Sequence, residues 1–131
     1  MKKMWSCVTA KKCIQEAEKG NTEFFSALTE FVTDPNPADV TGWTPLHEAA
    51  QEGELEVCCI ILERCEDQNP ADNHGQTPLH RAAEWGRLEV CRLILDRCED
   101  PNPSDVSDWT PLELASSCGH HEIVELIQSY F

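Results

Sequence analysis

The chain has 131 residues, 40% of them hydrophobic, which suits one domain with its own core. Its 24 acidic and 10 basic residues give a formal net charge of −14, which argues against DNA or RNA as a partner and favours a basic protein. No apolar run approaches the roughly 20 residues of a membrane helix, and no secretory signal is recognisable. We therefore expect no membrane partner, and reduced cysteines in the cytoplasm or the nucleus.

A 33-residue repeat organises the chain. The stretch GWTPLHEAAQEGELEVCCIILERCEDQNPAD from Gly42 aligns without gaps on GQTPLHRAAEWGRLEVCRLILDRCEDPNPSD from Gly75, and DWTPLELASSCGHHEIVELIQSYF follows from Asp108. A degenerate first unit precedes them; it lacks the TPLH signature but keeps Ala17, Gly20 and a DPNPAD loop. The sequence therefore predicts one domain of four units, divided at 1–39, 40–72, 73–105 and 106–131.

Each unit with the signature predicts two short helices. A threonine is expected to cap the first helix, with proline at the first helical position, where its missing N–H costs nothing. These threonines are Thr44, Thr77 and Thr110, and the first helices are expected to run to Gly53, Gly86 and Gly119. The second helices carry apolar pairs one turn apart: Val57 and Cys58 with Ile61 and Leu62, Val90 and Cys91 with Ile94 and Leu95, Ile123 and Val124 with Ile127. Only a stacked neighbour can bury such a stripe.

Both ends of the chain are modified as the ends of a stack require. Lys11, Lys12 and Lys19 give the first unit a polar outer side. In the last unit Glu113 replaces the histidine of the signature and is expected to close a capping box with Thr110. We expect these two units to cap the array.

The TPLHxAAxxG signature at a period of 33 residues resembles the ankyrin repeat over essentially the whole chain. The resemblance implies an all-α solenoid of four helix-turn-helix units, joined by β-turn or hairpin loops. It also implies a monomeric, non-catalytic module without a cofactor, which binds another protein as an adaptor, scaffold or inhibitor. The sequence departs from the family where glycine commonly follows the second helix, because Val32, Cys65 and Cys98 stand there. We expect an altered helix end and a small local loss of stability.

No residue pattern indicates an enzyme, since the chain has no P-loop, no GxSxG motif and no dinucleotide-binding glycines. His47 and His80 belong to the repeat signature, and Cys58 and Cys91 fall on the predicted core stripe. One alternative function stays open, a redox- or metal-responsive thiol protein. Its residues would be Cys59, Cys118, His120 and His121. Because no paired CxxC or HxxxH spacing accompanies them, we do not expect a metal site.

The resemblance places partner-binding residues on a concave face, made by the loop tips and the exposed sides of the first helices. Three groups recur in the second to fourth units: the loop tips, the residue after TPLH, and the pair before the glycine. In that order they are Val40, Thr41, Trp43, Asn73, His74, Gln76, Val106, Ser107 and Trp109; Glu48, Arg81 and Leu114; and Gln51, Glu52, Glu84, Trp85, Ser117 and Cys118.

Tryptophan and acidic residues together predict what this face binds. Trp85 is the strongest candidate for a binding hot spot, because tryptophan buries a large rigid surface, whereas Trp43 and Trp109 could instead pack against a neighbouring loop. Residues 40–72 hold eight acids and one base, against six acids and four arginines in 73–105. We expect Glu48 and Glu52, beside Trp85, to attract a basic segment of the partner.

The family also suggests a modification, because some ankyrin proteins carry a hydroxylated loop asparagine. Asn36, Asn69 and Asn102 occupy that position, eight residues after Leu28, Ile61 and Ile94. The alternative is an asparagine that only bonds the backbone of its own loop.

Overall fold

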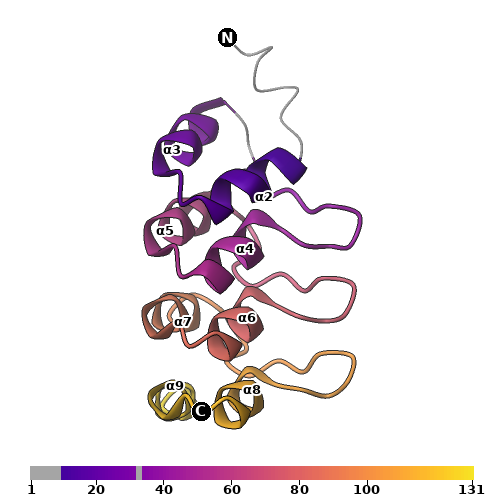
Figure 1. Ribbon diagram of the computed structural model, residues 1–131, viewed down its shortest axis with the longest axis vertical. Coiled ribbons are helices and arrows are strands. Elements are labelled where there is room, and N and C mark those ends of the chain that lie inside the picture. The colour runs from indigo at the N-terminus through magenta and orange to yellow at the C-terminus, as the bar shows by residue number, and fades with distance from the viewer. Residues whose placement is uncertain (1–9, 32–33) are drawn as a thin grey trace.

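Four pairs of helices stack along one axis in the computed structural model, which describes residues 10–31 and 34–131 (Figure 1). The pairs are α2 (Ala10–Glu18) with α3 (Thr22–Phe31), α4 (Pro45–Glu52) with α5 (Leu55–Arg64), α6 (Pro78–Glu84) with α7 (Leu88–Leu95), and α8 (Pro111–Ser117) with α9 (His121–Gln128). Hairpin loops project on the side of α4, α6 and α8, so we call α2, α4, α6 and α8 the inner helices and the others the outer helices. The described residues form no strand, and none of their helices is long and apolar enough to cross a membrane.

The threonines predicted as N-caps lie at the starts of α4, α6 and α8. Thr44, Thr77 and Thr110 each accept the backbone N–H of the residue three positions on, with proline at the helix start. In α8, Glu113 completes the predicted capping box by accepting the Thr110 N–H at 3.3 Å. His47 and His80 also close capping boxes in α4 and α6, a role that the sequence did not predict for them.

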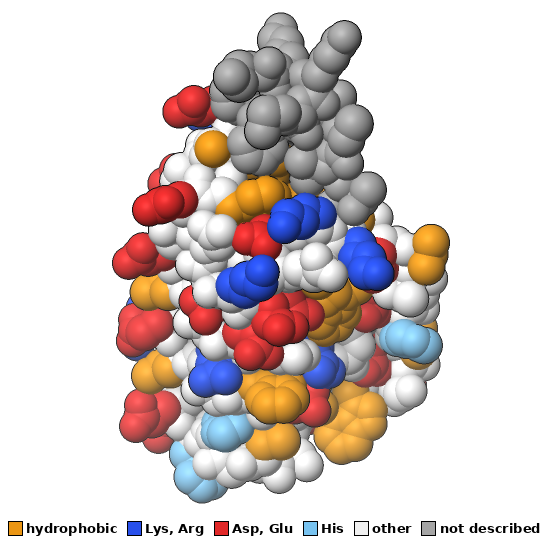
Figure 2. Space-filling model, turned by 45° about the horizontal axis from the view of Figure 1, so that its top comes forward, with side chains coloured by type: hydrophobic (Ala, Val, Ile, Leu, Met, Phe, Trp, Pro, Cys, Tyr) orange, Lys and Arg blue, Asp and Glu red, His pale blue; other side chains and the backbone are white. Residues whose placement is uncertain are grey.

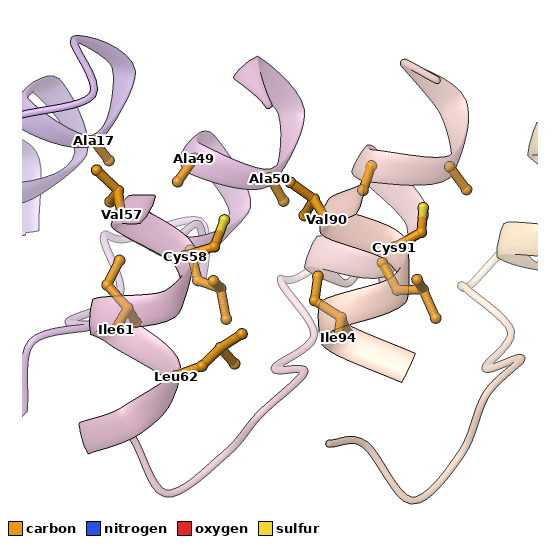
Figure 3. Packing of buried hydrophobic residues seen from close by; sticks show 14 of the residues in the cluster. Ala17, Ala49, Ala50, Val57, Cys58, Ile61, Leu62, Val90, Cys91 and Ile94 are labelled. Atoms are coloured by element: carbon orange, nitrogen blue, oxygen red, sulfur yellow. The ribbon is translucent and has the colours of Figure 1, made fainter. Parts of the chain in front are cut away.

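The core lies between the two rows of helices. Paired alanines such as Ala49 and Ala50 are fully buried and let adjacent helices approach closely (Figure 3). The predicted stripe of α5 packs there, and Cys58 is completely buried, as is Cys91 of α7. Val124 of α9 is only half-buried although its counterpart Cys91 is not exposed at all. The last unit therefore leaves part of its stripe open.

Buried histidines join the second repeat to the third and the third to the fourth. The Nε2 atom of His47 lies 2.8 Å from the carbonyl oxygen of Gln76, and that of His80 lies 2.9 Å from the carbonyl oxygen of Trp109. Since a carbonyl only accepts, Nε2 carries the hydrogen, and Nδ1 is left to accept the N–H of Thr44 or Thr77. Neutral imidazole satisfies all these partners, and burial lowers the pKa of both histidines.

An aspartate shapes each hairpin loop. Asp39 Oδ1 accepts the N–H groups of Thr41 and Trp43 at 2.8 and 3.0 Å, and Asp72 and Asp105 repeat this arrangement. Neighbouring loops also bond each other, the Asn73 N–H to the carbonyl oxygen of Thr41 and the Val106 N–H to that of His74. The loop tips are therefore held at fixed positions beside the inner helices.

The outer helix α5 ends as the missing glycine predicts. Cys65 caps it with φ −80° and ψ 149°, an extended conformation, where a left-handed glycine is common in the family. Its thiol donates to the carbonyl oxygen of Asp67 at 3.3 Å, and Cys98 bonds Asp100 in the same way. Val32, the third such position, lies outside the described residues.

Candidate functional site

The inner face consists of the hairpin loops and the exposed sides of the inner helices (Figure 2). Trp85 lies on it at the C-terminal end of α6, and half of its surface, 50%, is exposed to solvent. Apolar side chains also stand at two hairpin tips, where Val40 is 96% and Val106 70% exposed. The inner face thus exposes three large apolar side chains to solvent, of which Trp85 is the largest.

Trp43 is packed, but against side chains of α4 and α6 and not only against a neighbouring loop, as the sequence alternative had it. Its ring stacks on His47 with the ring centroids 4.8 Å apart, and its Nε1 donates to Glu48 at 3.0 Å. The guanidinium carbon of Arg81, from the next repeat, lies 5.4 Å from the ring centroid of Trp43. Trp43 and Glu48 therefore support the inner face and are less available to a partner than the sequence suggested.

Arg81 joins the second and third repeats across the inner face. Its Nε and Nη2 atoms donate to Gln51 Oε1 at 3.1 and 2.7 Å, and its Nη1 donates to Glu84 at 3.0 Å. These contacts hold three predicted face residues in one arrangement and place a cation there. The acidic surface expected around Trp85 is therefore divided by a paired positive charge.

Carboxylates gather on the part of the inner face nearest the first repeat. Burial raises the pKa of Glu48, and the nearby negative charges of Glu18 and Glu52 raise it further. Glu18, at the end of α2, is missing from the predicted set. The sequence does hold a signal for it, because Glu18 stands 33 residues before Gln51, but the first unit lacks the TPLH signature that locates the face in the other units.

Six of the nine predicted loop-tip residues line one hollow of about 540 Å³ between the hairpins, and Val40, Asn73 and Trp109 lie outside it. Thr41, Trp43, His74, Gln76, Val106 and Ser107 line it together with Asp72 and Asp105. The side chains of the loops also bond each other, Gln76 donating to the Asp105 carboxylate and Asn73 to the carbonyl oxygen of Val40. The hairpins therefore offer a preformed concave surface.

The predicted face residues of the last repeat lie at two sites, the end of α8 and the C-terminal end of the stack. Ser117 and Cys118 are exposed at the end of α8, and Leu114 is half-buried on the same helix. Trp109, which is 43% exposed, lines a separate hollow at the C-terminal end of the stack, with Leu112 and Val124 of that end. Trp109 thus lies at the border of the inner face.

The residues of the thiol alternative do not converge. Cys59 is half-buried on α5 of the second repeat, whereas Cys118 is exposed in the fourth. His120 bonds the carbonyl oxygen of Glu84 at 3.1 Å through Nε2, and His121 begins α9. Residues 10–31 and 34–131 hold no group of three or more histidine, cysteine or carboxylate side chains placed to bind a metal.

The loop asparagines bond the next helix and not their own loop, which corrects the simpler of the two expectations. The Oδ1 atoms of Asn36, Asn69 and Asn102 accept the N–H groups of Leu46, Leu79 and Leu112 at 2.8, 3.1 and 3.1 Å. Each asparagine therefore satisfies an open donor at the start of an inner helix. Their hydroxylation stays a prediction.

Comparison with known families agrees with this architecture. A model of ankyrin repeats in three copies matches residues 13–105 and 66–130. No curated protein matches the chain. Ankyrin repeats are generally protein-interaction modules, and the family is typically non-catalytic. The chain belongs to the ankyrin-repeat family.

Proposed function

We propose that the protein is a non-catalytic adaptor, scaffold or inhibitor that binds a basic segment of a partner protein on its inner face. The observation that carries the proposal is the half-exposed indole of Trp85 at the end of α6. A large rigid side chain in this position loses little conformational entropy when a partner covers it.

Charge on the inner face favours a basic partner. Glu18 and Glu52 each lie close enough to Glu48 for their negative charges to act on it, and the chain carries a formal net charge of −14. The cation of Arg81 is balanced by Glu84, with which it pairs, so the three glutamates still give this part of the face a net negative charge. Lysine or arginine side chains of a partner would be attracted to the carboxylates while an apolar residue covers Trp85.

The hairpin tips supply a second region of contact. Val40 and Val106 are exposed on loops whose backbones are fixed by Asp39 and Asp105. A preformed loop costs little ordering entropy on binding. We propose that the partner spans from these tips to Trp85.

The test is an affinity measurement with charge-matched variants. A partner captured from a native source on the immobilised protein is identified, purified and titrated against Trp85→Ala, Glu52→Lys and Glu63→Lys. Trp85→Ala should lower the affinity about tenfold or more, and Glu52→Lys several-fold, with a weaker effect at high salt. Glu63→Lys makes the same charge change on the outer helix α5 and should have little effect. Unchanged affinity in both inner-face variants would exclude the proposed site.

Three finer proposals accompany this function. The protein acts as a monomer, and it acts in the cytoplasm or the nucleus, where the unpaired described cysteines would stay reduced. Asn36, Asn69 and Asn102 are proposed hydroxylation sites, and each bonds the start of an inner helix through Oδ1. Intact mass spectra of the native protein would show each modification as the mass of one added oxygen atom, and spectra without such a species would count against it.

A further inference from the structure

The C-terminal end of the stack is a face that no described residue covers. A Cβ atom added to Gly53 would meet Arg87, and one added to Gly86 would meet His120, each from the following repeat. At Gly119, the equivalent position in the last repeat, nothing lies within 4 Å. We call the open surface of α8 and α9 on this side the end face.

The end face is hollowed and keeps apolar groups. A hollow of about 410 Å³ lies there, with Trp109, Leu112, Glu113 and Val124 in its wall. Leu112 and Val124 are half-buried, whereas their counterparts in the third repeat, Leu79 and Cys91, are fully buried under the fourth. The end face therefore has the shape and part of the apolar character of a surface on which another layer packs.

The second repeat shows what such a layer supplies. Trp43, in the same position of its repeat as Trp109, carries the guanidinium of Arg81 over its ring, 5.4 Å from the ring centroid. Arg81 comes from the following repeat. No described residue takes that place at Trp109, which remains 43% exposed. The end face thus presents an indole without the guanidinium that lies over the equivalent indole of the second repeat.

Glu113 determines which kind of hydrogen-bonding group can bind beside Trp109. In the second and third repeats the equivalent residues, His47 and His80, donate a hydrogen bond to a carbonyl oxygen of the next hairpin. A carboxylate can only accept, and Glu113 Oε1 already accepts from Thr110. The Oε2 atom of Glu113 makes no hydrogen bond within the described residues. A further hairpin would bring a carbonyl oxygen against this carboxylate, so the end face suits a cationic donor better than another repeat.

We infer that the end face binds an arginine-bearing segment of another protein, with the guanidinium over Trp109 and bonded to Glu113. Arginine fits better than lysine because its planar guanidinium can stack on an indole and bond a carboxylate at the same time. The apolar part of the segment would cover Leu112 and Val124. This inference does not rest on the proposed function, because Trp85 and the carboxylates of α2 and α4 take no part in it.

The test follows the indole N–H signals by nuclear magnetic resonance in the intact protein. The probe is an acetylated, amidated peptide of four arginines, compared with the same peptide of four lysines, and Trp109→Phe assigns the Trp109 signal. The arginine peptide should shift the Trp109 signal saturably, whether or not it also shifts the Trp85 signal of the inner face, which is proposed to attract basic segments as well. The lysine peptide should bind several-fold more weakly.

Two glutamine variants distinguish binding at the end face from a general attraction between the acidic protein and the basic peptide. Glu113→Gln keeps a side chain that can cap α8 but removes the charge, and should weaken the arginine peptide about fivefold. Glu122→Gln removes an equal charge at the exposed start of α9, outside the hollow, and should leave binding within about twofold of the parent. Equal losses in both variants, a shift of Trp85 in place of Trp109, or no shift at all would overturn the inference. A Trp109 signal that moves with protein concentration alone would assign the end face to a second copy and would also overturn it.

Discussion

His47 and Gln76 join two repeats through one buried hydrogen bond of 2.8 Å, from the imidazole Nε2 to the backbone carbonyl oxygen. The same ring accepts the Thr44 N–H and stacks under Trp43. It therefore connects a helix start, the next hairpin and the support of the inner face. Because His80 bonds Trp109 in the same way, the two histidines help the direct bonds between the loops to fix the relative positions of the hairpins.

Loss of His47 should destabilise the protein strongly. His47→Ala leaves the Thr44 N–H and the Gln76 carbonyl oxygen without their partner in a buried region, which should cost about 2 to 4 kcal/mol of unfolding free energy. Urea unfolding followed by circular dichroism measures the change. Glu113→Ala alters the equivalent but exposed position and should cost about 1 kcal/mol or less. Equal losses in the two variants would contradict the bridging role.

Mild acid should destabilise the fold through the same histidines. Burial lowers the pKa of His47 and His80 below their ordinary value of 6.5, which they regain on unfolding. The unfolded chain therefore binds protons more readily, so the stability is fully present above about pH 6.5 and is lost as the pH falls through the lower folded pKa. The urea midpoint should be lower at about pH 5.5 than at about pH 7.5, and less so in the double variant His47→Gln and His80→Gln. A midpoint that rises on acidification would contradict this.

Two glycines with the same backbone angle should tolerate alanine very differently. Gly75 and Gly119 have φ of 77° and 80°, but an added Cβ at Gly75 would lie 2.9 Å from the backbone of Asp105 and Val106, whereas nothing approaches Gly119. Gly119→Ala should therefore cost only the left-handed conformation, about 1 kcal/mol. Gly75→Ala should cost about 3 kcal/mol, because it also separates two hairpins. Similar unfolding midpoints for the two variants would disprove the close approach of the hairpins.

The order in which the cysteines react with a thiol reagent should follow how deeply each is buried. Burial raises the pKa of Cys91 to about 12 and that of Cys65 to about 11, and it also raises the pKa of the fully buried Cys58. Since the thiolate is the reactive form, these residues should resist iodoacetamide in the folded protein, while the exposed Cys118 should react first. Peptide mapping by mass spectrometry gives the order. Early labelling of Cys58 would show that the stripe of α5 opens under native conditions.

The fold could be predicted because its determinants are local and recur. Thr44, Pro45 and Gly53 define the two ends of α4, and Thr77 and Pro78 start α6 in the same way, although α6 ends at Glu84 with Trp85 as its cap, one residue before Gly86. The stripe of α5 indicated which side faces the core, and Val57 and Cys58 are buried as expected. A single unit with these signals would be ambiguous, but three units in register leave one architecture.

The arrangement of the inner face could be predicted only in part, because its contacts cross repeat boundaries. Position alone placed Trp43 and Trp85 on the same face, yet Arg81 and His47 pack against the first and leave the second exposed. Nothing in the spacing indicates which side chains will pair across a boundary. Asn36 is a similar case, since its hydrogen-bond donor, the Leu46 N–H, lies ten residues away at the start of another element.

The central claim, that a partner protein covers Trp85 on the inner face, is tested most directly by hydrogen–deuterium exchange of the protein with and without a purified partner. Peptides spanning α6 and the following turn, residues 78–87, should exchange more slowly in the complex, together with those of the hairpin tips at 39–43 and 105–109. Peptides of the outer helices α5 and α7 should exchange at the same rate in both states. Protection confined to α5 and α7, with residues 78–87 unchanged, would contradict the account.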